Sequence, residues 1–264
     1  MAIQASATSF TENFDELMNN QPLIGQGGWI SQRPNDQIPY VSSGTGVDTS
    51  QTMSNVVGGN APNTVEYGAQ HLLSPAFSYS ASDTHVVLAV DTRHIGGNGP
   101  TAGLSFTPTI PANGAIGSNL FGINTPGSAL RTYLISGDGL GHEGDNLVLG
   151  DWYRLQEVVD FSTPGGTGTF FYEDLTAGQT SFTEDATLRG VPLDLPSDGS
   201  GHYTAYLVWA SADGTPGTSY IDNINFAGPS SAPAPEPTAA YGMALLLALF
   251  GTGKRVRRGS PAVA

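Results

Sequence analysis

The run Trp152-Tyr-Arg-Leu-Gln-Glu-Val-Val-Asp-Phe161 decides the fold class of this chain. Every second residue of the run is apolar except Glu157: the apolar positions are Tyr153, Leu155, Val159 and Phe161. This alternation is typical of a β-strand with one buried face. Thr163-Pro-Gly-Gly-Thr167 follows as a hairpin-type turn, and residues 169–175 form a second strand-like run. The sequence therefore predicts an antiparallel hairpin.

Strand-like segments separated by Gly, Pro, Asn or Asp continue on both sides of this hairpin. The apolar run Val86-Val-Leu-Ala-Val90 lies in one of them, at residues 85–92. The others lie at residues 10–15, 71–79, 103–107, 120–123, 130–136, 146–149, 179–182, 203–210 and 219–226. About a dozen short strands, without helical periodicity or a strict internal repeat, predict an all-β domain. We expect a two-sheet antiparallel sandwich over residues 8–228.

The composition excludes several functional classes. The 264 residues include 35 glycines and no cysteine, and the formal net charge is −14. Without cysteine the chain has no disulfide, no Cys-based metal site and no thiol nucleophile. An acidic surface repels nucleic acid and anionic lipid, whereas it suits solubility, cation binding or a saline habitat.

Three segments carry a family resemblance. Phe10-Thr-Glu-Asn-Phe-Asp15, followed by Gly27-Gly-Trp29, resembles the opening of a concanavalin A-like or carbohydrate-binding jelly roll. Residues 150–155 and 168–172 look like the paired back strands of laminin G-like domains, and residues 220–224 look like their closing strand. The resemblance implies a jelly-roll sandwich in which the first and last strands are neighbours. It also implies carbohydrate binding, and often a structural calcium beside those strands.

Alternation places one carboxylate on each apolar face of the end strands. Glu12 shares a face with Phe10 and Phe14 in the first strand. Asp222 is expected on the face of the last strand that carries Tyr220, Ile224 and Phe226. A buried carboxylate must be paired, protonated or bound to a cation. If the strands are neighbours, Glu12 and Asp222 converge on a calcium ion, with Asp15 and Asn223 near enough to contribute. The alternative is that each accepts hydrogen bonds from backbone amides or pairs with an arginine.

No catalytic constellation is complete. The Gly-rich acidic segment 137–146 contains Asp138, His142, Glu143 and Asp145, and we expect it to be an exposed loop. Laminarinase-type jelly rolls carry Glu-x-Asp-x-x-Glu, but from Glu143 the third acid would fall at Val148. The sequence contains neither a Gly-x-Ser-x-Gly elbow nor a nucleotide-binding fingerprint, and its five histidines show no i, i+4 pair. We therefore assign no catalytic residue.

Aromatic residues are the candidates for sugar stacking. We single out Trp29, in a Gly-rich connection, and Trp152, after a turn, as ligand-binding candidates; for both the alternative is a packing role. Trp209 is expected in the core because it shares an alternating face with Tyr203, Ala205 and Leu207. Further candidates are Tyr40, Tyr67 and Tyr133.

The C-terminal tail has the order of parts of a sorting signal. A Pro-rich linker at residues 229–237 ends in Pro235-Glu236-Pro237, and residues 238–253 are apolar and uncharged. As a helix this run is about 24 Å long, against roughly 30 Å for a bilayer core. A basic cluster follows: Lys254, Arg255, Arg257 and Arg258. Together these parts resemble the PEP-CTERM sorting signal, which implies a short hydrophobic helix and basic tail over residues 238–264. It also implies export, transient anchoring in the bacterial inner membrane, and processing by an exosortase.

Residues 1–7 end in Ala5-Ser6-Ala7, which fits the small-x-small pattern of a signal-peptide cleavage site. We interpret them as the remnant of a signal peptide whose start lies upstream. The sequence thus predicts an exported bacterial cell-surface or matrix protein that serves as a non-catalytic binding or structural module, most plausibly for exopolysaccharide. The alternatives are a glycan-active hydrolase or lyase on the same scaffold, and a matrix or coat component that binds no sugar.

Overall fold

The protein is an antiparallel β-sandwich. The computed structural model describes residues 9–31, 39–47, 50–54, 66–95, 101–105, 118–125, 129–137, 139–195, 202–211 and 218–228. The chain divides into two compact units, Met1–Ser231 and Ala232–Ala264, and every described residue belongs to the first. The expected hydrophobic helix and the sorting-signal residues of the tail lie outside the described residues, as do residues 1–7.

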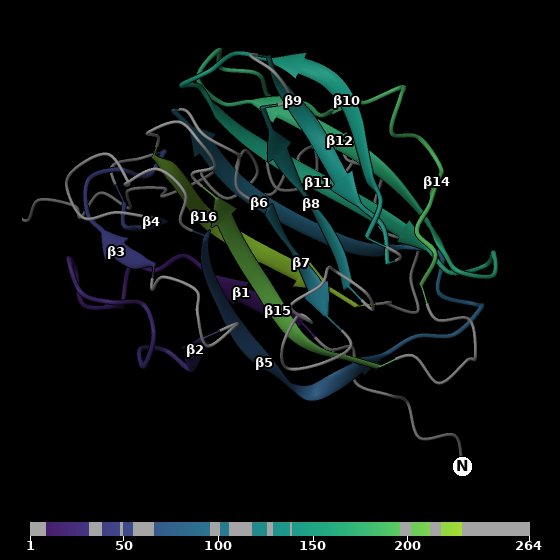
Figure 1. Ribbon diagram of the computed structural model, residues 1–264, viewed down its shortest axis with the longest axis horizontal. Helices are drawn as coiled ribbons and strands as arrows, with labels where there is room; N and C mark the ends of the chain where they lie inside the picture. Colours follow the sequence, from purple (N-terminus) through teal and green to yellow (C-terminus); the bar gives the residue numbers. More distant parts are fainter. Residues whose placement is uncertain are drawn as a thin grey trace, which may run out of the picture. The chain divides into compact units, whose positions relative to one another are not determined.

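Among the described residues, one sheet has nine strands; Figure 1 shows how they are arranged. Its central order is β13 (Thr183–Glu184), β12 (Thr167–Asp174), β11 (Trp152–Asp160), β6 (Val86–His94), β16 (Ser219–Ala227), β4 (Thr52–Ser54) and β3 (Tyr40–Ser42). β1 (Ser9–Glu12) also pairs with β16, and β14 (Val191–Pro192) pairs with β12. The pairing of β1 with β16 confirms the expectation that the first and last strands are neighbours.

The other sheet has seven strands in the part of the chain that the structure describes. Its order is β10 (Gly141–Leu147), β9 (Leu130–Ile135), β8 (Ser118–Asn124), β7 (Thr101–Ser105), β15 (His202–Ser211), β5 (Glu66–Ser78) and β2 (Trp29–Ser31). All pairings in both sheets are antiparallel. The described part of the chain contains strands and turns but no α-helix, which confirms the all-β class. Nor do these residues include a helix of the length and hydropathy that crossing a membrane requires.

The hairpin predicted around residues 152–175 is present. β11 and β12 pair from Tyr153–Asp174 to Asp160–Thr167, and Gly165 and Gly166 in the connecting turn have φ values of 84° and 73°. Only glycine adopts such values without steric cost, so Pro-Gly-Gly fixes the reversal of the chain.

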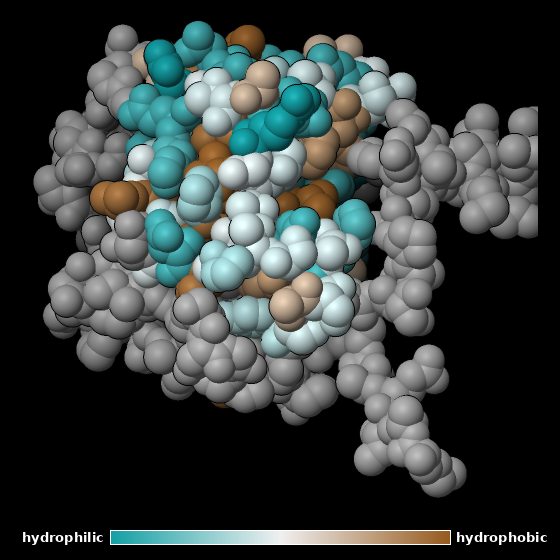
Figure 2. All heavy atoms as spheres, turned by 90° about the vertical axis from the view of Figure 1, so that its right-hand side faces the viewer, coloured by the Kyte–Doolittle hydropathy of each residue, from teal (hydrophilic) through white to brown (hydrophobic). Residues whose placement is uncertain are grey.

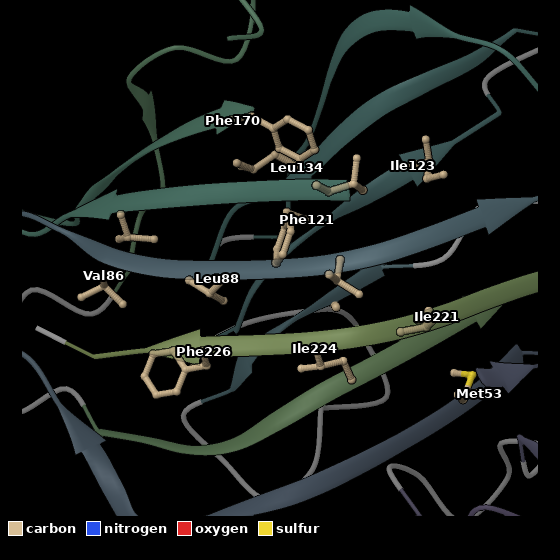
Figure 3. Packing of buried hydrophobic residues seen from close by; sticks show 14 of the residues in the cluster. Met53, Val86, Leu88, Phe121, Ile123, Leu134, Phe170, Ile221, Ile224 and Phe226 are labelled. Carbon is tan, nitrogen blue, oxygen red and sulfur yellow. The ribbon is translucent and has the colours of Figure 1, made fainter. Parts of the chain in front are cut away.

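The core lies between the two sheets (Figure 3). β6 contributes Val86, Leu88 and Val90, which alternate with half-buried residues, so the continuous apolar run still has one core face. Opposite them, Phe121 of β8 meets the ring of Phe170 edge to face, with centroids 6.0 Å apart. Burying about thirty such side chains supplies the main stabilising term, because each contributes about 1.5–3 kcal/mol of transfer free energy.

Three sequence expectations need correction. The acidic segment expected as a loop is in large part strand β10, whose Gly141–Glu143 stretch pairs with β9. The strand expected at residues 179–182 is instead the two-residue β13 at Thr183–Glu184. In β16 a bulge shifts the register between Asp222 and Asn225, with Asn223 at a φ of 45°.

The bulge in β16 changes which residues face the core. Ile221, Ile224 and Phe226 belong to the core. Asp222 is the register partner of Asp91, and both lie on the outer face of the nine-stranded sheet. The prediction that Asp222 shares a face with Ile224 and Phe226 is therefore wrong. One inserted residue reverses the alternation beyond it, and asparagine tolerates the left-handed backbone that the bulge needs.

Candidate functional site

Glu12, at the end of β1, is hydrogen-bonded through both carboxylate oxygens. Oε1 accepts from the Phe14 amide at 2.7 Å, and Oε2 accepts from the indole Nε1 of Trp29 at 3.0 Å. Phe14 has a φ of 61°, so Glu12 stabilises a strained turn after the strand. The Trp29 ring is completely buried, 5.9 Å from Phe14 and 6.0 Å from Phe10. Trp29 is therefore a core residue whose polar atom is paired, and it offers no exposed face for stacking.

Asp222 has a separate set of donors. Its Oδ1 accepts from the Asn223 amide at 2.8 Å and its Oδ2 from the Ser50 hydroxyl at 3.0 Å. Burial raises the pKa of Asp222 to about 7; the two hydrogen bonds oppose this rise, and the charges of Asp91 and Asp15 add to it. Protonation near neutral pH thus removes much of the cost of burying this carboxyl.

Glu12 and Asp222 do not fit a shared calcium ion. Glu12 contacts the core residue Trp29, whereas Asp222 lies on the outer face of the sheet. Each accepts a backbone amide hydrogen bond, which is the alternative that the sequence left open. Within the described ranges, no group of three or more His, Cys, Asp or Glu residues is arranged to hold a metal ion.

A row of charged residues crosses four adjacent strands on the outer face of the nine-stranded sheet. In register order the residues are Asp222 (β16), Asp91 (β6), Arg154 (β11) and Glu173 (β12). Arg154 donates from Nε and a terminal nitrogen to the two oxygens of Asp91, both at 2.8 Å, and Asn223 donates to Asp91 at 2.9 Å. This bidentate geometry compensates the buried Asp91 charge.

The three carboxylates of the charged row are buried, whereas Arg154 has 31% of its side chain exposed. Asp91 and Asp222 are completely buried, and Glu173 is 5% exposed. Burial raises the pKa of Glu173, the Arg154 charge opposes that rise, and the Asp91 charge adds to it. Trp152 lies on the same face, is 7% exposed, and has its ring 6.3 Å from that of Tyr220. Trp152 is thus also packed, so neither predicted tryptophan presents an open platform.

Two further carboxylates are buried between the sheets. Within the described residues Glu157 of β11 accepts one hydrogen bond, from the side-chain amide of Asn119 in β8 at 2.9 Å, and burial raises its pKa to about 8. Asp185, after β13, accepts from the Thr132 hydroxyl, from the Asp145 amide at 2.8 Å, and from the amides of Thr187 and Leu188 at 2.9 and 3.1 Å. Both are completely buried, so they serve the fold and do not reach a substrate.

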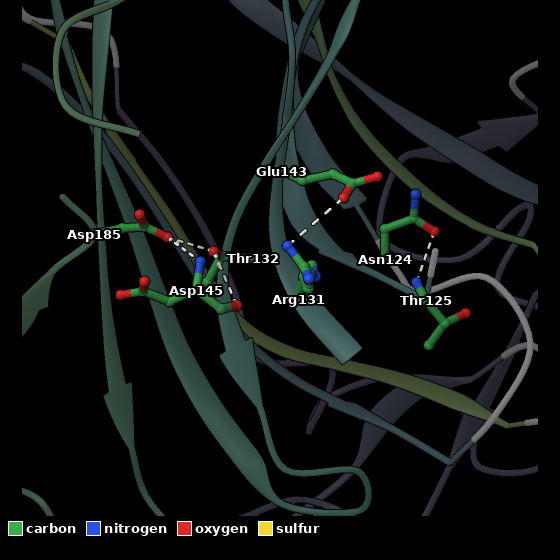
Figure 4. A network of polar contacts seen from close by, with 7 residues as sticks. All are labelled: Asn124, Thr125, Arg131, Thr132, Glu143, Asp145 and Asp185. Atoms are coloured by element: carbon green, nitrogen blue, oxygen red, sulfur yellow. Dashed lines mark hydrogen bonds and ion pairs between the residues drawn. The ribbon is translucent and has the colours of Figure 1, made fainter. Parts of the chain in front are cut away.

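Figure 4 shows how Asp185 holds the β9–β10 edge beside Asp145 and Thr132. Asp185 is not among the site residues predicted from the sequence. Asp185-Ala-Thr187 has the spacing of an Asx-turn, which indicates the local bonds, but the partners at residues 132 and 145 have no local signal. A Cβ added at Gly144 would lie 2.0 Å from Asp185 Oδ2, so the glycine makes room for the carboxylate.

Glu143 and Asp145 do not form a catalytic pair. Glu143 approaches the guanidinium of Arg131 at 3.8 Å on the outer face of β10. Asp145, beyond a register shift, accepts a hydrogen bond from the hydroxyl of Tyr172 in the other sheet at 3.2 Å. A glycosidase needs two carboxyl groups that face one bond of the sugar, and these two carboxyl groups serve different partners.

Tyr133 is the predicted aromatic candidate that lies beside exposed charged groups. It is half-buried on β9 and pairs in register with Glu143 of β10. Burial raises its pKa, and the Glu143 charge adds to the rise. Arg131 and Glu143 have 38% and 44% of their side chains exposed. Tyr40 is half-buried, and the side chains of Tyr67 and Trp209 lie outside the described residues.

No protein-family model matches the sequence, and no curated protein sequence matches it. Solved structures do match. A lectin from Bauhinia forficata in complex with GalNAc aligns with 12% identity and a TM-score of 0.55, over 86% of this chain and 100% of the lectin. The T. cruzi calreticulin globular domain aligns with 14% identity and a TM-score of 0.51, over 93% and 94%. Peanut lectin aligns with 14% identity and a TM-score of 0.50, over 84% and 97%. The chain therefore has the concanavalin A-like jelly-roll fold.

Proposed function

We propose that this protein is an exported, non-catalytic carbohydrate-binding module. The fold carries the proposal, because two of the similar structures are lectins and one of them is in complex with GalNAc. The fold alone does not assign a function, so the support must also come from the chain's own residues.

The placement of the carboxylates supports binding over catalysis. Glu157, Asp185 and Asp222 are completely buried, and Glu143 and Asp145 face different partners. The surface also suits a polar ligand: residues of hydrophilic or intermediate hydropathy cover most of the coloured face in Figure 2, and hydrophobic ones lie in small separate groups. A glycan presents mainly hydroxyl groups, which such a surface can hydrogen-bond.

The tail supports the proposed location. Pro235-Glu236-Pro237, an apolar run and the cluster from Lys254 to Arg258 resemble a sorting signal. On this proposal an exosortase processes the protein, the apolar run anchors it transiently in the inner membrane, and the sandwich reaches the cell surface or extracellular matrix. Fractionation of the native bacterium, with mass analysis of the C-terminus, tests this part. A full-length chain found in the cytosol would contradict it.

A glycan array followed by a reducing-end assay tests the activity. We expect binding to at least one glycan with no new reducing ends and no unsaturated product. New reducing ends would instead show a hydrolase or lyase, and absence of binding across the array would favour a structural coat component. The array must carry both neutral and uronate polysaccharides, since the net charge of −14 bears on which class binds.

A further inference from the structure

The outer surface of β9 and β10 has an unusual arrangement around Tyr133. Gly141 lies two residues before Glu143, the register partner of Tyr133, and therefore on the same face of β10. A Cβ built on Gly141 would lie 1.8 Å from the Tyr133 hydroxyl oxygen, 2.5 Å from Cζ and 2.9 Å from Cε2. The phenol thus occupies the space of a side chain at residue 141. The side chain of Tyr133 therefore leans diagonally over the neighbouring strand.

At this position the tip of the phenol lies over the Gly141 backbone, on the outer face of β10. The residue is half-buried, so part of the ring remains accessible. Sugars present C–H groups on one face of the ring, which pack on an aromatic surface, and hydroxyl groups at the edge, which need donors and acceptors.

Arg131 and Glu143 supply those donors and acceptors. They flank Tyr133 on the same outer face: Arg131 is two residues away on β9, and Glu143 is opposite on β10. Their closest nitrogen and oxygen are 3.8 Å apart, which exceeds hydrogen-bond length. With 38% and 44% of their side chains exposed, both retain hydrogen-bonding capacity for a ligand. Figure 4 shows the two side chains turned toward each other at the sheet surface.

We propose that Tyr133, Arg131 and Glu143 form a subsite for one sugar ring of a neutral polysaccharide. This inference rests on the proposed carbohydrate-binding function and names its site and ligand class. The charge of the protein favours a neutral polysaccharide over an acidic one. The chain carries a net charge of −14, which repels polyuronates, while Arg131 and Glu143 compensate each other within the subsite.

The experiment is affinity electrophoresis of the full chain in gels that contain laminarin, xylan, galactomannan or alginate. We expect the wild type to be retarded by at least one of the three neutral polymers. Tyr133→Ala should weaken that binding about tenfold, because it removes the stacking surface, while Tyr133→Phe should stay within about twofold. Tyr220→Ala, at a half-buried tyrosine on the other sheet, is the matched control and should bind like the wild type.

Each result decides between defined alternatives. Retardation that Tyr133→Ala leaves unchanged would overturn the subsite and leave the proposed function standing. Retardation by alginate alone would overturn the neutral class, and no retardation by any polymer would overturn the function together with the subsite. If the Ala variant does not fold by circular dichroism, Tyr133→Leu removes the ring while keeping most of the volume and is read in the same way.

Discussion

Glu157 and Asp185 are both completely buried carboxylates, but they differ in the number of hydrogen bonds that they accept. Asp185 accepts four hydrogen bonds, two from its own turn and two from the β9–β10 edge. Glu157 accepts one, from Asn119, and Oε1 of Glu157 and Oδ1 of Asn119 both lack a hydrogen-bond partner within the described residues. The two carboxyls are equally buried but unequally supplied with donors, and with the single donor of Glu157 burial raises its pKa to about 8.

Asp185 and Glu157 also have different structural roles. Asp185 fixes the bulge of β10, the strand that carries Gly141 and Glu143, so it positions the surface around Tyr133. Glu157 lies within the core, where Asn119 Oδ1 is an acceptor without a donor among the described residues. A protonated carboxyl carries an O–H donor, which an ionised carboxylate does not have. The comparison therefore predicts opposite consequences when each carboxylate is replaced.

The largest expected effect is the loss of stability in Asp185→Ala. The substitution leaves four donors without their acceptor, and we expect the free energy of unfolding to fall by about 3–5 kcal/mol. Urea unfolding followed by circular dichroism measures it. Asp160→Ala is the control, because Asp160 is half-buried and, among the residues that the structure describes, its carboxylate accepts one hydrogen bond, from the nearby Ser162 amide. A loss for Asp185→Ala as small as that for Asp160→Ala would contradict the anchoring role.

The second expected effect is a gain in stability, in the variant Glu157→Gln. In the folded state Glu157 keeps its proton up to about pH 8, whereas in the unfolded chain it ionises above its ordinary pKa of 4.5. Between these values the unfolded state binds fewer protons, so stability falls as pH rises. Glu157→Gln removes this titration, and we expect it to be more stable than the wild type by about 3 kcal/mol at pH 7.

Urea unfolding of both proteins from pH 4.5 to 8 checks this prediction. The two should be similar at pH 4.5, and the advantage of Glu157→Gln should grow up to about pH 8. Asp222 also has a raised pKa, near 7, and contributes to the wild-type slope, so the difference between the two curves is the quantity to compare. A constant difference across the range would show that Glu157 is not held as an acid.

A smaller effect tests the space around Asp185. In Gly144→Ala the new Cβ would lie 2.0 Å from Asp185 Oδ2 and 2.3 Å from the Thr132 hydroxyl oxygen, so one of them must move. We expect a loss of about 1–3 kcal/mol. In the Asp185→Ala background the same substitution should cost less, because the carboxylate is already gone. Additive losses in urea unfolding would show that Gly144 and Asp185 are not coupled.

Local patterns predicted the sandwich because alternation reports which face is buried. The same rule placed Glu157 on the apolar face of β11 and gave a reason to examine it. It failed at Asp222, because a single bulge residue, Asn223, reverses the faces. Trp29 was singled out for a different reason, its Gly-rich connection, and the structure shows the alternative packing role, because the distant Glu12 provides the indole with a partner and allows it to be buried.

The site residues show the limit of sequence reasoning more clearly. Tyr133 was one of several aromatic candidates, and nothing in its local sequence distinguished it from Trp29 or Trp152. What distinguishes it is Gly141, eight residues later, which leaves room for the ring only after β9 and β10 have paired. Asp185 was missed because two of its four donors are 53 and 40 residues away.

The smallest expected effect concerns calcium, and it tests whether hydrogen-bond donors alone account for the remaining carboxylates. Within the described residues Glu12 and Asp222 each accept two hydrogen bonds from N–H or O–H groups, and the two side chains lie on opposite faces of the sheet, so they do not converge on one cation. We therefore expect the same thermal midpoint in EDTA and in excess calcium. A midpoint that EDTA lowers and calcium restores would mean that a bound cation stabilises the fold. If Glu12→Gln or Asp222→Asn abolished that shift, the cation would be bound at the end strands. Hydrogen-bond donors alone would then not explain how this sandwich accommodates its buried carboxylates.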